Sequence, residues 1–89
     1  MGVAALKIKI MPEQGVNLEE LKTKLESSLT KAGAIRIESI EEQEIAFGLK
    51  ALILTLAWPE EKETEDAANS CKIDNVSSVD IIDYRRAFG

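Results

Sequence analysis

The same local pattern occurs twice along this chain of 89 residues. An apolar segment ends in a Pro-Glu pair, first at 12–13 and again at 59–60, and each pair is followed by polar residues and then by a helical pattern. This duplication indicates two strand-helix-strand units. Joined with right-handed crossovers, two such units predict the element order β-α-β-β-α-β, with an antiparallel sheet and both helices on one face.

The first strand is predicted by apolar residues that alternate with basic ones from Leu6 to Ile10, and Pro12 ends it. Alternation buries one face and leaves the other in water, so we expect Lys7 and Lys9 on the open face of the sheet. Asp80 of the last strand should lie beside them, where its opposite charge can pair across the ladder.

The first helix is predicted over Leu18–Ala32. Asn17 can cap it, with Glu20 three residues further on in the spacing of a capping box. Leucines then recur at spacings of three and four residues, which is typical of a helix with one buried face. Gly33 provides a left-handed stop at its C-terminus.

Residues 34–40 are predicted to form a short second strand, followed by an acidic turn at 41–44. Two interpretations apply to its carboxylates, which are Glu38, Glu41, Glu42 and Glu44. They could hold a metal ion, or they could be a solvated turn. We favour the solvated turn, because the spacing does not match a calcium loop.

The second half contains a nearly continuous apolar run from Leu49 to Trp58, which predicts a central strand ended by Pro59. Acidic residues then surround Thr64, the expected cap of a second helix. Cys71 could be a reactive thiol or a small core residue, and we expect the core. Residues 79–82 predict the last strand.

These elements predict one domain over residues 1–89 with the ferredoxin-like α+β sandwich fold. The longest and most apolar strands should occupy the centre of the sheet, which gives the strand order 4-1-3-2. The composition, with 45% hydrophobic and 30% charged residues, agrees with a chain that folds alone.

The composition also excludes several classes of function. The chain has no histidine and one cysteine, which removes the usual zinc sites, an internal disulfide and the Ser-His and Cys-His nucleophile pairs. Sixteen acidic against 11 basic residues give a net charge of −5, and the four aromatic residues are scattered, so nucleic acid is not favoured as the main partner. No segment reaches the length of a membrane span or resembles a secretory signal. We expect a cytoplasmic protein without cofactor or metal, and not an enzyme.

Two segments are candidates for contact with a partner. Phe47 and Gly48 lie between the acidic stretch and the third strand, where the aromatic ring could project from a loop or pack in the core. The end of the chain, residues 84–89, is expected to be a short tail with two adjacent cations. Its arginines, Arg85 and Arg86, could hold a phosphate or a carboxylate.

The chain resembles the archaeal form of the translation elongation factor 1 beta family over essentially its whole length. The most specific similarity is the Phe-Gly-Leu-Lys-Ala-Leu segment. The stretches that carry the resemblance are Ile8-Lys9-Ile10-Met11-Pro12-Glu13, Ala46-Phe47-Gly48-Leu49-Lys50-Ala51-Leu52, Trp58-Pro59-Glu60, Val76-Ser77-Ser78-Val79-Asp80 and Arg85-Arg86-Ala87-Phe88-Gly89.

The resemblance implies a guanine nucleotide exchange factor for elongation factor 1 alpha, the GTPase that delivers aminoacyl-tRNA. It also implies the ferredoxin-like fold and a role without covalent chemistry. Phe47 would contact the GTPase, together with Gly48. Eukaryotic members have an aromatic or apolar residue near the end of the chain and a lysine two positions later. Tyr84 falls on the first of these positions and Arg86 on the second, with Arg85 between them. Arginine at this position departs from the family's lysine, because a planar fork and a point charge fill a metal site differently.

An alternative from another class of function is a regulatory, ligand-binding domain of the same fold that dimerises through its open sheet face. The oligomeric state discriminates between the two, because the exchange factor should be a monomer until it meets its GTPase.

Overall fold

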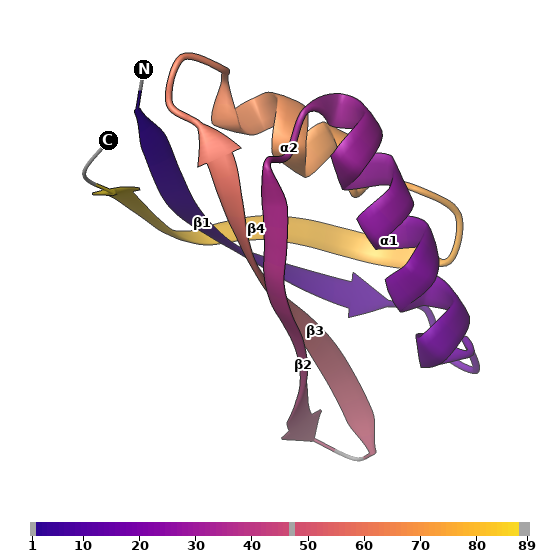
Figure 1. Cartoon of the computed structure of the whole chain (residues 1–89). Coiled ribbons are helices and arrows are strands. Elements are labelled where there is room, and N and C mark those ends of the chain that lie inside the picture. The colour runs from indigo at the N-terminus through magenta and orange to yellow at the C-terminus, as the bar shows by residue number, and fades with distance from the viewer. Residues whose placement is uncertain (1, 47, 88–89) are drawn as a thin grey trace.

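The computed structural model describes residues 2–46 and 48–87 and contains one four-stranded sheet with two helices. Its elements are β1 (Val3–Pro12), α1 (Leu18–Ala32), β2 (Arg36–Ala46), β3 (Leu49–Pro59), α2 (Thr64–Ser70) and β4 (Val76–Ala87). The sheet order is β2-β3-β1-β4, and every neighbouring pair is antiparallel (Figure 1). This confirms the predicted ferredoxin-like fold and strand order, because 4-1-3-2 is the same order counted from the other edge.

Helix α1 has the bounds that its sequence predicts. The side chain of Asn17 accepts hydrogen bonds from the backbone N–H groups of Glu19 and Glu20, at 3.0 and 3.3 Å. At the other end Gly33 has a φ of 118°, and its N–H donates to the carbonyls of Leu29 and Thr30. Only a residue without a side chain adopts this left-handed conformation at little cost, so Gly33 ends the helix.

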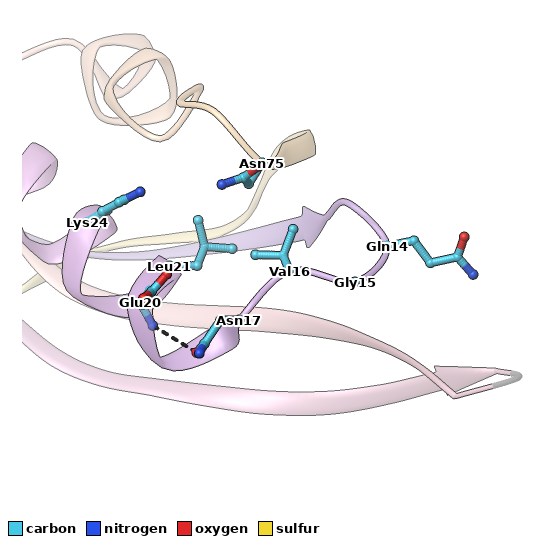
Figure 2. Close-up of a pocket in the computed structure, with 8 residues that line it drawn as sticks. All are labelled: Gln14, Gly15, Val16, Asn17, Glu20, Leu21, Lys24 and Asn75. Carbon is cyan, nitrogen blue, oxygen red and sulfur yellow. Dashed lines mark hydrogen bonds between the residues drawn. The ribbon is translucent and has the colours of Figure 1, made fainter.

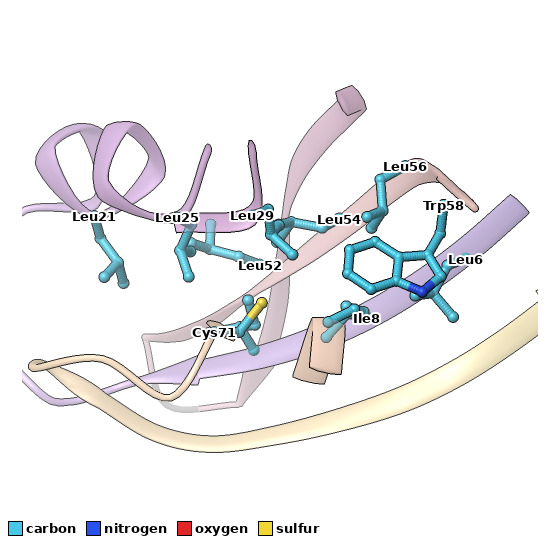
Figure 3. Close-up of a cluster of buried hydrophobic side chains, with 12 residues drawn as sticks. Leu6, Ile8, Leu21, Leu25, Leu29, Leu52, Leu54, Leu56, Trp58 and Cys71 are labelled. Atoms are coloured by element: carbon cyan, nitrogen blue, oxygen red, sulfur yellow. The ribbon is translucent and has the colours of Figure 1, made fainter. Parts of the chain in front are cut away.

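The core lies between the helices and one face of the two central strands (Figure 3). Alternate residues of β1 and β3 face the helices and are fully buried, and Trp58 is the largest of them. The helices contribute three leucines from α1 and two small residues at α2. The buried cluster consists of Leu6, Ile8, Ile10, Leu21, Leu25, Leu29, Leu52, Leu54, Leu56, Trp58, Ala67 and Cys71.

The prediction for the second strand and the acidic turn was wrong. Strand β2 continues to Ala46, so Glu41, Glu42 and Glu44 are strand residues paired with β3 rather than a turn. The apolar strand β3 offers backbone partners along its whole length, and pairing ends only at Ala46 opposite Leu49. Charged side chains on this long outer strand also protect its edge against pairing with another chain.

The cap predicted for the second helix was also wrong. Glu63 is the N-cap residue, it makes no side-chain cap bond, and Thr64 is already the first helical residue. The acidic residues Glu65 and Asp66 occupy the first turn, where they favour the positive end of the helix dipole.

The open face of the sheet carries the predicted lysines of β1. Lys9 lies opposite Asp80 and Lys7 lies opposite Asp83 in the register of β1 and β4. In the part of the chain that the structure describes, neither lysine comes within 4 Å of a carboxylate oxygen. The predicted neighbours are therefore in place, although they form no close ion pair.

Candidate functional site

The hairpin between β2 and β3 forms one exposed end of the molecule (Figure 1). Gly48 has a φ of 77°, and no atom lies within 4 Å of the position that a Cβ would take. Ile45 and Leu49 on either side are 44% and 40% exposed, so they add apolar surface to this end of the molecule. Phe47, the aromatic residue of this segment, lies outside the described residues.

An apolar groove lies next to the hairpin. Its walls come from the end of β1, the connection to α1 and the first residues of β3, and it encloses about 130 Å³. Pro12, Val16, Leu18 and Leu49 supply apolar surface, and Glu13 and Lys50 add charges. An exposed apolar surface beside an exposed hairpin is the kind of feature that marks a protein-binding region.

A second hollow of about 380 Å³ shares the β1–α1 connection with this groove (Figure 2). It is lined by Gln14, Gly15, Val16, Asn17, Glu20, Leu21, Lys24 and Asn75. The side-chain oxygen of Asn17 is already occupied by the N–H groups of α1. This hollow therefore offers space and a few polar side chains, but no pair of groups arranged for nucleophilic catalysis.

The predicted C-terminal tail is instead part of the sheet. Strand β4 continues to Ala87, and Tyr84, Arg85 and Arg86 lie opposite Leu6, Ala5 and Ala4 of β1. The prediction of a tail was wrong because β1 is long enough to pair with these residues up to its own first position. Phe88 and Gly89 lie outside the described residues.

Each of the three candidate residues on β4 has a defined environment. Tyr84 is 42% exposed, and its backbone N–H donates to Asp83 Oδ1 at 2.9 Å. Arg85 Nε lies 3.2 Å from Asp83 Oδ2. Arg86 forms an ion pair with Glu60, through Nη2 and Oε1. The two arginines are consecutive residues of an edge strand, so they extend from opposite faces of the sheet, each with one carboxylate partner.

The structure does not bring the candidate residues together. Arg86 lies opposite Ala4, which in turn lies opposite Trp58 near the end of β3, whereas Gly48 precedes the start of β3. The length of β3 separates them, roughly 30 Å at about 3.3 Å per residue. The molecule extends 42 Å along its longest axis. The candidate site therefore consists of two regions at opposite ends of the sheet.

The described residues contain no cluster of metal-ligating side chains. No group of three or more cysteine, aspartate or glutamate side chains in this part of the chain could hold a metal ion. Cys71 is fully buried, and burial raises the pKa of its thiol to about 12, so it stays protonated. Cys71 is thus a core residue, as expected.

Two features of these ends were missed in the sequence. Leu49 belongs to an apolar run that predicts a buried strand, and nothing in the run shows that its first residues extend past the helices. Glu60 was assigned to the acidic approach to α2, although its side chain reaches Arg86. The signal that could have indicated the exposed end is strand length. Long hairpin strands reach further than the helices that cover the sheet, so their ends remain uncovered.

These features define a ferredoxin-like α+β sandwich with a hairpin that exposes apolar residues at one end of its sheet and two exposed arginines at the other. A family model described as the EF-1 guanine nucleotide exchange domain matches residues 5–87. The elongation factor 1-beta of Methanosarcina barkeri is 46% identical, and the match covers 97% of this chain and 99% of that protein. The proteins of the same name from Staphylothermus marinus and Natronomonas pharaonis are 39% and 36% identical, with at least 91% of each chain covered.

The chain therefore belongs to the family of EF-1 guanine nucleotide exchange domains. It is a nucleotide exchange factor of translation elongation, which confirms the resemblance found in its sequence. Neither helix in the described part of the chain has the length and apolar character of a membrane span.

Proposed function

We propose that this protein promotes the release of GDP from the GTPase elongation factor 1 alpha, by binding it and without covalent chemistry. The observation that carries the proposal is the presence of two exposed regions at opposite ends of one hydrogen-bonded sheet. A rigid sheet can hold an apolar contact at one end while it presents cations at the other. We place the protein in the cytoplasm, where translation takes place, as a single domain over residues 1–89 without cofactor.

The physical basis of such exchange is a difference in affinity. A GTPase holds GDP through a magnesium ion and the phosphates, and the nucleotide loses affinity when a partner binds the displaced arrangement more tightly than the loaded one. The coupling is reciprocal, so bound GDP weakens the partner in turn. Binding energy at one end of the sheet can therefore support disruption at the other.

The two ends have different roles in this proposal. Phe47 and Gly48 dock on the GTPase, and the exposed apolar residues Ile45 and Leu49 extend the same contact. Tyr84, Arg85 and Arg86 lie toward the nucleotide, where a guanidinium can compete with the magnesium ion for phosphate or carboxylate oxygens. The resemblance places Arg86 where eukaryotic members carry a lysine, and an arginine can donate to two oxygens at once.

The protein acts as a monomer when it is free. The alternative, a regulatory domain that dimerises through the open sheet face, would bury Lys7 and Lys9 at the centre of the interface. Neither lysine has a carboxylate within 4 Å in the described part of the chain. Burying an unpaired charge is costly, so this face is poorly suited to a second copy. Analytical ultracentrifugation tests this point, and a stable dimer would favour the alternative.

The direct test is the release of labelled GDP from elongation factor 1 alpha, measured with and without this protein. We expect a large acceleration that depends on protein concentration and saturates. Bovine serum albumin at the same concentration serves as the control for non-specific effects. Binding to the GTPase without any acceleration would contradict the proposed exchange activity.

A further inference from the structure

The ion pair between Arg86 and Glu60 is the contact from which a further role can be derived. It joins β4 to the residue that follows β3, across the end of the sheet. The ion pair is made through Nη2 of the guanidinium, and the side chain of Arg86 remains 72% exposed, against 25% for Glu60. A guanidinium has five N–H donors in one plane, so most of them still face solvent.

Glu60 is itself held in place by the start of the chain. Its backbone N–H donates to the carbonyl of Gly2 at 3.0 Å. Its carboxylate lies over the same residue, because a Cβ built on Gly2 would come within 1.8 Å of Glu60 Oε2. A glycine at position 2 therefore leaves the space that the carboxylate occupies. Gly2, Glu60 and Arg86 form a chain of contacts from the first residues to the last strand.

We infer that Glu60 is a positioning residue for Arg86, which it holds by one nitrogen so that the other donors face the GTPase. The inference rests on the proposed function, since it assumes that Arg86 acts on the nucleotide site. An exposed arginine samples many rotamers, and ordering it on binding costs about 0.5–1.5 kcal/mol. Glu60 supplies part of this order in advance. The group that the free donors recognise is an anionic oxygen, from a phosphate or a carboxylate.

This arrangement gives a physical reason for arginine at position 86. A guanidinium can donate to Glu60 from one nitrogen and to a second anion from the others, in a fixed plane. The ammonium group of a lysine is a single charged centre on a flexible stem, so it cannot hold both partners in such a geometry.

The test is a double-mutant cycle on the maximal rate of GDP release from elongation factor 1 alpha. Glu60→Gln should lower this rate roughly two- to tenfold and leave the half-saturating concentration nearly unchanged. This range is the cost of ordering the Arg86 side chain, converted to a change in rate. In the Arg86→Ala background the same substitution should have no further effect. Glu61→Gln is the matched control, since it makes the same change in charge at an exposed neighbour.

A second variant and a second measurement make the test independent of the assay. Gly2→Ala places a methyl group where the carboxylate of Glu60 lies, so it should slow release as Glu60→Gln does, without adding to it. In the free protein, ¹⁵N relaxation of the Arg86 Nε–H group should show greater mobility in both variants. The melting temperature should stay within a few degrees of the parent value.

The outcomes separate this inference from the proposed function. If Glu60→Gln slows release equally in the Arg86→Ala background, Glu60 touches the GTPase itself and the inference is overturned. Unchanged mobility of Arg86 in both variants also overturns it. If Arg86→Ala slows release and Glu60→Gln does not, the inference alone fails. If Arg86→Ala releases GDP at the parent rate, the role proposed for Arg86 fails together with this inference.

Discussion

Trp58, the single tryptophan of the chain, lies beneath a lysine of the β3–α2 connection. Its side chain is fully buried at the end of β3, and its indole N–H finds no acceptor among the described residues. The ammonium group of Lys62 lies 5.7 Å from the ring centroid. The same lysine passes Gly33 so closely that a Cβ there would lie 3.0 Å from Cε and Nζ. One cation therefore covers the indole ring beside the C-terminus of α1.

We expect Lys62→Met to lower the free energy of unfolding by about 0.5–2 kcal/mol, because it removes both a cation–π contact and a charge at a helix C-terminus. Methionine keeps the length of the side chain, so the loss reports the charge rather than a cavity. Urea denaturation followed by the fluorescence of Trp58 measures the change. Lys24→Met on the exposed side of α1 is the control, and equal losses in the two variants would exclude a special role for Lys62.

The β2–β3 hairpin is the element that extends furthest from the helices. A small network of ion pairs connects it to α1. Glu42 accepts a hydrogen bond from Lys22 of α1 at 2.9 Å and from Lys50 of β3 at 3.3 Å. The hydrogen bond from Lys22 has the largest effect on the pKa of Glu42, and the bond from Lys50 has the next largest. Both lower this pKa below its ordinary value. The bond to Glu42 likewise raises the pKa of Lys22. The network is exposed to solvent, so its contribution is modest and sensitive to salt.

The pH dependence of stability should reveal this network. A carboxylate with a lowered pKa in the folded state stabilises the fold above its unfolded pKa, and that stabilisation is lost as the pH falls through the folded value. The difference in unfolding free energy between the parent and Glu42→Gln should therefore be largest near neutral pH and decline as the pH falls through the lowered pKa of Glu42. Urea midpoints across this range measure it. Glu41→Gln is the neighbouring control, and a difference that grows in acid would contradict the network.

For the whole molecule, the separation of its two ends predicts that their contributions to exchange are independent. Substitutions more than about 10 Å apart with no shared partner usually add within about 0.5 kcal/mol. Phe47→Ala should weaken binding to the GTPase by about 1–3 kcal/mol, as expected of an interface anchor, with little change in melting temperature. Arg86→Ala should slow release at saturation and leave binding nearly intact.

The double variant then tests the independence of the two ends. The measured quantity is the maximal release rate divided by the half-saturating concentration. The free-energy loss that the double variant shows in this ratio should equal the sum of the losses of Phe47→Ala and Arg86→Ala. Titration of labelled elongation factor 1 alpha with each variant measures both quantities. A strongly non-additive result would mean that the ends act on one another through the sheet. If Phe47→Ala unfolds easily and its folded fraction binds normally, Phe47 is a core residue instead.

The sequence was most informative where local signals and burial agree. Asn17 and Gly33 define the ends of α1 through backbone bonds within a few residues, so its bounds could be predicted. The strand order followed from the apolar character of β1 and β3. The edge strands were less predictable, because exposure on an edge removes the apolar pattern: the acidic part of β2 was taken for a turn and the end of β4 for a tail.

The contact between Arg86 and Glu60 could not be found in the sequence for a related reason. It depends on the register of two strands that do not pair with each other but share β1 as a neighbour. Neither residue lies in a recognisable motif with the other. The resemblance to a family indicated that position 86 matters, whereas only the assembled sheet shows which carboxylate lies beside it.

The pairing of β1 with β4 has a consequence for the newly synthesised chain. Val3 lies opposite Ala87, so this edge of the sheet cannot close until the ribosome has made all of β4. A nascent chain can form α1 and the hairpin early, while β1 waits for its second partner. Contacts between residues far apart in the sequence form slowly, because closing a long loop costs entropy. The arginine end of the molecule therefore forms last, and a partly made chain has the hairpin proposed to dock before it has the residues proposed to release the nucleotide.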